Sequence, residues 1–223
     1  MLKHSMEIFD VDHTITRRSS GRHFVMQGIR RGFLPLRLYF TLPLYYLKYR
    51  LGGPFFGNMD RELYRRGFPE LKDREIAEIE RLSLRSFEER LKGDIFAQAI
   101  ELVHGLRSSG RQIVLATSSL DVIIKPLAEF LGVTEIIATR LEFIDGRCTG
   151  RFLSPPLFGV EKKRRVAEFV HRRGGVLDNC SFYSDSFHDL PLLEVVGRPV
   201  AVNPDFRLRK IAKKRNWEIL RLH

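Results

Sequence analysis

Short apolar runs rich in β-branched residues alternate with longer helical patterns, and this alternation constrains the fold more than any other feature. The runs are residues 7–9, 112–116, 135–138, 181–183 and 199–202. Such alternation predicts an α/β fold in which helices cover a parallel sheet. A chain of 223 residues is long enough to bury one full-sized core with a smaller appendage.

Glycines and turn residues mark where the predicted helices and a hairpin end. Amphipathic patterns predict helices over residues 95–109, 121–131 and 160–173, and the glycines that end them are Gly110, Gly132 and Gly174. Residues 141–152 predict a β-hairpin, because Asp145-Gly146 is a favoured two-residue turn between alternating residues.

Residues 17–90 interrupt the alternation. They contain no convincing strand and separate the first strand from the second by about a hundred residues. Their first half is basic and aromatic, and residues 60–90 show a mixed-charge, amphipathic helical pattern. We therefore expect a core domain formed by residues 1–16 and 91–223, with an inserted helical domain over residues 17–90.

The charge and the cysteines bound the partners and the compartment. The chain has 38 Lys and Arg against 27 Asp and Glu, a net charge of +11 that favours anionic partners such as nucleic acid, an acidic membrane face or phosphorylated metabolites. Cys148 and Cys180 form neither a disulfide framework nor a zinc motif. Without an export signal at the N-terminus, the sequence predicts a cytoplasmic protein.

Two carboxylates directly follow the first predicted strand. Asp10 and Asp12 are two residues apart, at the strand end where α/β sheets bind ligands. One could act as a nucleophile while the other transfers protons. Taken alone, the pair fits an ordinary acidic loop equally well.

Two further aspartates, Asp185 and Asp189, follow the strand predicted at residues 181–183. Parallel strands end at the same edge of a sheet, so these carboxylates are expected to converge with Asp10 and Asp12. Such a cluster repels itself unless a hard cation such as Mg²⁺ is bound. The spacing therefore indicates a candidate metal site.

Hydroxyl groups and a lysine complete the candidate site. Thr117, Ser118 and Ser119 follow the second predicted strand and lead into a helix, where they could hold an anion. Taken alone they fit a helix N-cap better. Lys162 lies in the charged run 161–165 and, taken alone, fits a solvated helix face.

In this order the motifs resemble those of the haloacid dehalogenase-like (HAD) phosphatase superfamily, most closely subfamily IB, which contains the phosphoserine phosphatases. The matching residues are, motif by motif, Asp10, Asp12 and Thr14, then Thr117, then Lys162 with Lys163 as a register alternative, and last Asp185 and Asp189. The resemblance covers essentially the whole chain outside residues 17–90. It implies a Rossmann-like core with a helical cap inserted after the first strand.

The resemblance also implies a role for each residue. Asp10 would attack phosphorus and form an aspartyl-phosphate, and Asp12 would protonate the leaving oxygen and then activate water. Thr117 and Ser118 would bind the phosphoryl oxygens, and Lys162 would neutralise their charge.

The expected cofactor is Mg²⁺. By the same resemblance it would be held by the Asp10 carboxylate, the Asp12 backbone carbonyl and Asp185, with Asp189 steadying the ligands or a bound water. The chain is thus expected to be a Mg²⁺-dependent phosphomonoester hydrolase.

The predicted cap residues bear on the substrate. Phosphoserine phosphatases carry a Glu shortly after the first motif, whereas residues 15–20 here contain no carboxylate, which disfavours an amino-acid phosphate. Residues 30–50 instead combine Arg30 and Arg31 with an apolar, aromatic run at residues 33–47 that is too short to span a bilayer. This pattern suggests contact with an anionic membrane, at the inner face, and a lipid or amphiphilic phosphate such as phosphatidylglycerophosphate or lysophosphatidate. Burial of the run within the cap is the alternative.

Three other functions stay open at this point. The same site would suit a phosphoserine-type phosphatase of small metabolites, or a phosphotransferase with an alcohol acceptor. A non-catalytic nucleic-acid binder is a remote alternative, suggested by the basic residues 207–215, although the sequence has no recognised nucleic-acid-reading motif.

Overall fold

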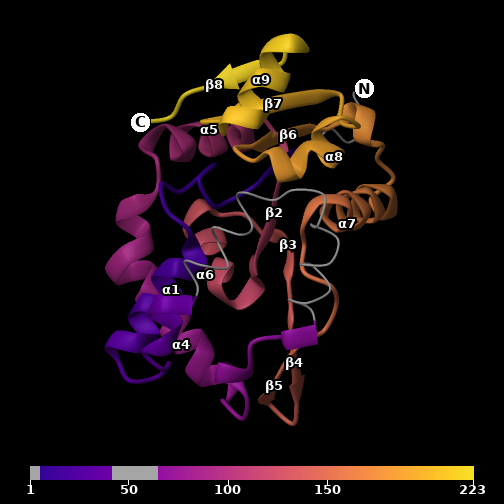
Figure 1. Cartoon of the computed structure of the whole chain (residues 1–223). Coiled ribbons are helices and arrows are strands. Elements are labelled where there is room, and N and C mark those ends of the chain that lie inside the picture. Colours follow the sequence, from indigo (N-terminus) through magenta and orange to yellow (C-terminus); the bar gives the residue numbers. More distant parts are fainter. Residues whose placement is uncertain (1–5, 42–64) are drawn as a thin grey trace.

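A six-stranded parallel sheet forms the centre of the protein. The computed structural model describes residues 6–41 and 65–223, and the strand order is β3-β2-β1-β6-β7-β8 (Figure 1). The strands are β1 (Met6–Phe9), β2 (Gln112–Leu120), β3 (Glu135–Thr139), β6 (Ser181–Ser184), β7 (Arg198–Val202) and β8 (Glu218–Leu220). The predicted α/β fold, with a Rossmann-like parallel core, is confirmed.

Side chains alternate between the two faces of this sheet and build two apolar layers. Ile8, Val114 and Phe182 pack against the helices α7 (Gly159–Arg172), α8 (Leu190–Leu193) and α9 (Phe206–Lys214). Their strand neighbours Phe9, Leu115 and Tyr183 pack on the opposite face, against α5 (Ala97–Ser108) and α6 (Asp121–Leu131). Burial on both faces explains why the strands are continuous apolar runs.

The predicted helix ends and hairpin are confirmed. α6 ends at Gly132, whose φ of 65° favours glycine, and a Cβ there would lie 2.3 Å from the Arg107 guanidinium. The hairpin consists of β4 (Leu141–Ile144) and β5 (Arg147–Phe152). Asp145 and Gly146 between them have φ values of 48° and 77°, as a turn of type I′ requires.

Two features of the sheet differ from the sequence-based expectation. Thr117, Ser118 and Ser119 neither follow the second strand nor cap the next helix, because β2 continues through them to Leu120, which is itself the N-cap of α6. The pairing of β2 with β3 shifts register between Ala116 and Leu120, which lets the strand extend past its apolar part. The edge strand β8 was not predicted.

The segment after β1 leaves the sheet and returns at one place. The backbone N–H of Arg17 donates to the Asp94 carbonyl (2.7 Å), and that of Phe96 donates to the Ile15 carbonyl (3.0 Å). Between these crossings lie α1 (Ser20–Arg30), α4 (Ile76–Ser86), a π-helical turn (Phe87–Leu91) and the short 3₁₀ helices Pro69–Leu71 and Lys92–Asp94. α1 and α4 lie side by side, far from β7 and β8 (Figure 1). The division into a core and an inserted domain over residues 17–90 stays a prediction.

The apolar run at residues 33–47 is described only as far as residue 41. In that part, Leu34 and Leu38 are buried in the core, whereas Leu36 and Phe40 are 63% and 65% exposed. Residues 42–47 of the run, and with them residues 42–50 of the predicted contact region 30–50, lie outside the described residues. Within residues 6–41 and 65–223, none of the helices combines the length and apolar content that crossing a bilayer requires.

Candidate active site

Asp10 and Asp185 lie next to each other where the two central strands end. β1 and β6 pair in parallel, and the Asp10 N–H donates to the Tyr183 carbonyl at 2.9 Å, so the ladder continues one residue beyond β1. The strand order runs in opposite directions from β1, which makes this edge the topological switch point where α/β sheets bind ligands. Both residues are only 6% exposed.

The hydroxyl group of Thr14 connects these two aspartates. It donates to Asp10 Oδ2 (3.3 Å) and accepts the backbone N–H of Asp185 (3.0 Å). Thr14 is 1% exposed, so the link is shielded from water. The third residue of the first motif thus fixes the Asp10 carboxylate relative to the end of β6.

Lys162 joins Asp10 to the last predicted aspartate. It lies in the first turn of α7, and its Nζ is 2.9 Å from Asp10 Oδ1 and 2.8 Å from Asp189 Oδ2. Lys162 is 3% exposed, so the solvated-face alternative is wrong. Of the two register alternatives, Lys162 rather than Lys163 reaches the site.

Ser184 is a further site residue, which no sequence pattern predicted. Its hydroxyl donates to Asp189 Oδ2 at 2.7 Å, and the residue is fully buried at the end of β6. Asp189 therefore receives donors from both Ser184 and Lys162. A serine ending a strand carries no distinguishing pattern, and only the position directly before Asp185 could have drawn attention to it.

The buried charges at this edge do not balance. Two buried carboxylates, those of Asp10 and Asp189, share the ammonium group of Lys162. Burial raises the pKa of Asp10 to about 7, against the opposing effect of Lys162 and with a further increase from Asp189. For Lys162, burial lowers the pKa, but Asp10 and Asp189 outweigh it and hold the pKa above its usual value. Two buried carboxylates thus face one ammonium group.

The donor set suits a hard divalent cation. Thr14 links the Asp10 carboxylate to the backbone N–H of Asp185, whose side chain is also buried, and carboxylate oxygens are the ligands that Mg²⁺ prefers. No three His, Cys, Asp or Glu side chains in the described residues form a ready-made metal cluster, and Asp10 and Asp189 both contact Lys162. The predicted set, however, needs only two carboxylates and the Asp12 backbone carbonyl. The residues present therefore fit the ion.

Asp12 is held by the first turn of α1. Its Oδ1 accepts the backbone N–H of Ser20 (2.8 Å), and its Oδ2 accepts the hydroxyl of Ser19 (3.0 Å). The Ser20 hydroxyl in turn lies 2.6 Å from that of Ser119 in β2. The start of the inserted segment thus reaches into the site, which the sequence analysis did not predict.

Thr117 lies on the neighbouring strand, close to the level of Asp10. The register pairs Phe9 with Leu115, so Thr117 comes just beyond Asp10, and it is fully buried. Its Oγ1 accepts the backbone N–H of Ser119 at 3.1 Å. Ser118 contributes its backbone carbonyl, which accepts a hydrogen bond from Thr139 (2.8 Å). The role of Ser118 as a phosphate ligand stays a prediction.

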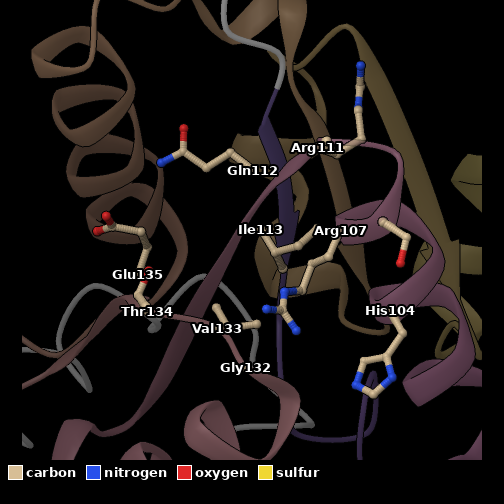
Figure 2. A pocket seen from close by; sticks show the side chains of 11 residues that line it. His104, Arg107, Arg111, Gln112, Ile113, Gly132, Val133, Thr134 and Glu135 are labelled. Carbon is tan, nitrogen blue, oxygen red and sulfur yellow. The ribbon is translucent and has the colours of Figure 1, made fainter.

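A separate cavity lies at the opposite edge of the sheet, where β2 and β3 begin (Figure 2). It has a volume of about 700 Å³ and is lined by His104, Arg107, Arg111 and Glu135 among others. Its arginines are already committed, because Arg107 donates to the Leu131 carbonyl and Arg111 to Glu7. The candidate site is therefore the carboxyl edge, not this cavity.

Known proteins are similar to this chain over the residues that form the candidate site. The haloacid dehalogenase-like hydrolase family matches residues 8–194. Phosphoserine phosphatase SerB1 of Mycobacterium tuberculosis is 35% identical over 211 residues, which cover 95% of this chain and 68% of that protein. A histidinol-phosphatase of Neisseria meningitidis is 40% identical over 123 residues, covering 53% and 55% of the two chains.

Solved structures show the same fold. A protein of unknown function from Bordetella pertussis superposes with a TM-score of 0.84 at 28% identity, over 97% of this chain and 98% of that one. A substrate-bound phosphoserine phosphatase superposes with a TM-score of 0.66 at 18% identity, over 98% and 93% of the chains. At that identity the second likeness concerns the fold alone.

Proposed function

The chain belongs to the haloacid dehalogenase-like hydrolase family, and from that premise we propose that it is a phosphatase that hydrolyses phosphomonoesters through an aspartyl-phosphate on Asp10. The observation that carries the proposal is the buried Lys162, whose ammonium group contacts both Asp10 and Asp189. It lies where a phosphoryl group bound to Asp10 gathers negative charge. Relatives named as phosphatases support the same reaction class.

The reaction has two steps. A carboxylate oxygen of Asp10 bonds to phosphorus while the bond to the leaving oxygen breaks, and Asp12 gives that oxygen a proton. Asp12 then takes a proton from a water molecule whose oxygen attacks phosphorus, which releases phosphate and restores Asp10. Thr117 donates a hydrogen bond to a phosphoryl oxygen.

Mg²⁺ fits this scheme as the cofactor. The Asp10 carboxylate, the Asp12 backbone carbonyl and Asp185 would hold it, with Asp189 steadying them through Lys162. Its chemistry is to neutralise charge on the phosphoryl oxygens. The uneven charge balance of the buried carboxylates supports this assignment.

The test is the Asp10→Asn variant, assayed with 4-nitrophenyl phosphate and Mg²⁺. Loss of the nucleophile should lower turnover by at least about 10³-fold, while circular dichroism stays unchanged. Asp178→Asn, at an exposed position far from the site, is the matched control and should retain full activity. Turnover by Asp10→Asn at more than a tenth of the normal rate would overturn the mechanism.

For the substrate we place a small phosphorylated metabolite first. The names of the relatives make phosphoserine and histidinol phosphate the first compounds to test. The first turn of α1 carries no acidic residue to meet an ammonium group, which argues against phosphoserine. A screen of these two compounds with sugar phosphates, lysophosphatidate and phosphatidylglycerophosphate separates the classes, and product analysis with added glycerol separates hydrolysis from phosphotransfer.

A lipid or amphiphilic phosphate is the second candidate. The observation that favours it is the exposure of Leu36 and Phe40 on either side of the cationic Arg37, whose side chain is 69% exposed. Co-sedimentation with vesicles containing anionic lipid should then exceed that with neutral vesicles and should fall in the variant Leu36→Ser/Phe40→Ser. Equal recovery with both kinds of vesicle would remove this candidate.

A further inference from the structure

The proton-transfer residue Asp12 is bound by the inserted segment rather than by the strand that precedes it. Ser19 and Ser20, at the start of α1, occupy one site on each carboxylate oxygen, at 3.0 and 2.8 Å. A carboxylate has about four lone-pair positions, so two donors orient it and still leave positions for proton transfer. The rotamer of Asp12 therefore depends on where α1 begins.

The same turn of α1 is tied to the strand that carries Thr117. The hydroxyls of Ser20 and Ser119 are 2.6 Å apart although the residues are separated by 99 positions in sequence. The N–H of Ser119 then donates to Thr117 Oγ1. One chain of hydrogen bonds thus runs from Asp12 through α1 to the phosphate-binding position.

We propose that Ser19, Ser20 and Ser119 are positioning residues that hold Asp12 beside the leaving oxygen and in register with Thr117. The inference rests on the proposed function, since it concerns the proton that Asp12 delivers. Ser19 fixes the carboxylate directly. The hydroxyl pair of Ser20 and Ser119 fixes α1 against β2, and general acid catalysis is lost quickly when such geometry loosens.

A change of leaving group isolates this role. Phenyl phosphate needs a proton on its leaving oxygen far more than 4-nitrophenyl phosphate does, because the leaving group of the latter is a stable anion. The kcat/KM for phenyl phosphate is therefore the more sensitive to proton transfer by Asp12. Ser19→Gly removes the hydroxyl while glycine remains an acceptable N-cap for α1. We expect kcat/KM to fall about tenfold or more for phenyl phosphate and less than about threefold for 4-nitrophenyl phosphate.

Ser19→Thr is the conservative counterpart. It keeps both the hydroxyl and the cap, so it should retain the normal response to the leaving group. Equal losses for both substrates in Ser19→Gly, or a Ser19→Thr variant that behaves like the glycine variant, would overturn the role of Ser19. Thermal melting of both variants checks that each is folded.

The hydroxyl pair is tested by a double-mutant cycle. Ser20→Ala and Ser119→Ala remove the same bond, so each should lower kcat/KM for phenyl phosphate about three- to tenfold, and the double variant should lose no more than either single one. Ser83→Ala is the matched control: Ser83 is buried in α4, its hydroxyl has no hydrogen-bond partner among the described residues, and its loss should change nothing. Independent losses that multiply would overturn the coupling.

These outcomes distinguish a failure of the proposed function from a failure of the positioning role. Full turnover by Asp10→Asn contradicts the proposed function itself. Loss of turnover in Asp10→Asn, together with a flat response of the serine variants to the leaving group, leaves the phosphatase mechanism intact and removes only the positioning role.

Discussion

The two ends of β1 each carry a buried carboxylate, and the protein neutralises them differently. At the amino end, Glu7 is 1% exposed and accepts two hydrogen bonds from the Arg111 guanidinium and one from the Tyr183 hydroxyl. One negative charge thus meets one positive charge and a neutral donor. A buried pair that is balanced and fully hydrogen-bonded can remain as part of the scaffold.

At the carboxyl end, by contrast, one ammonium group contacts two buried carboxylates. Lys162 contacts both Asp10 and Asp189, and all three side chains are buried. Burying excess charge is costly, and a fold keeps such a cluster only where something else compensates for it. The comparison teaches that the charge balance of a buried cluster, rather than burial itself, separates the candidate active site from the scaffold.

The largest expected effect comes from removing the ammonium group that Asp10 and Asp189 share. Lys162→Met should lower turnover of 4-nitrophenyl phosphate by about 10²–10³-fold, because the charge of the transferring phosphoryl group loses its fixed partner. Steady-state kinetics at saturating Mg²⁺ measures the loss. A variant within tenfold of the normal rate would show that Lys162 is structural, like Arg111.

The amino end should respond in the opposite way. Glu7→Gln leaves Arg111 without its carboxylate and should lower the free energy of unfolding by about 2–4 kcal/mol, with kcat unchanged at temperatures where the variant is folded. Urea unfolding measures the loss. Glu135→Gln breaks an exposed pair with Arg173 at the same edge and should cost about 1 kcal/mol or less. A fall in kcat for Glu7→Gln would contradict the division between the two ends.

The excess charge also predicts a pH dependence. Asp10 has a pKa raised to about 7, so below that pH a proton competes with Mg²⁺ for its carboxylate. Affinity for Mg²⁺ should fall by up to about tenfold per pH unit below 7, as measured by calorimetry, and Asp10→Asn should lose most of this dependence. At the amino end, burial and Glu7 raise the pKa of Tyr183, so its hydroxyl stays protonated throughout. An Mg²⁺ affinity that is constant from pH 5 to pH 8 would contradict the prediction.

The same pKa fixes the sign of the stability change in the metal-free protein. The folded chain binds the Asp10 proton more tightly than the unfolded chain, whose pKa is near 3.8. The contribution of Asp10 to stability is therefore present below pH 4 and is lost as the pH rises towards 7. Adding Mg²⁺ should recover it at neutral pH.

Much of the fold was predictable because it depends on local patterns. Every strand of the parallel sheet except β8 shows as an apolar run, and glycines such as Gly132 mark helix ends by their backbone conformation. β8 spans only Glu218–Leu220 at the sheet edge, too short for a periodic signal. The extension of β2 through Thr117 was missed because serine and threonine fit caps and strand ends equally well.

In the candidate site, too, the residues that belong to local motifs were predictable and those that depend on tertiary packing were not. Asp10, Lys162 and Asp189 were found because they belong to motifs with fixed order, and the structure brings them into contact. The pairing of Ser20 with Ser119 was not predicted, since it arises only when α1 packs against β2 across 99 positions. Sequence alone predicts which groups react, whereas the residues that position them follow from tertiary packing.

The smallest expected effect comes from two neighbouring residues of β6. Tyr183 contacts the carboxylate at the amino end of β1, and Ser184 lies at the carboxyl end. Tyr183→Phe keeps the ring stacked on Phe9 and removes only the hydroxyl that donates a hydrogen bond to Glu7. Ser184→Ala removes the hydroxyl that donates to Asp189. Each variant loses one hydrogen bond to a buried carboxylate and should lose about 1–2 kcal/mol of stability in urea unfolding. Only Ser184→Ala should also lower kcat/KM, by about three- to tenfold, because Asp189 shares Lys162 with Asp10. An equal loss of activity in Tyr183→Phe would mean that the two ends of the strand act as one unit.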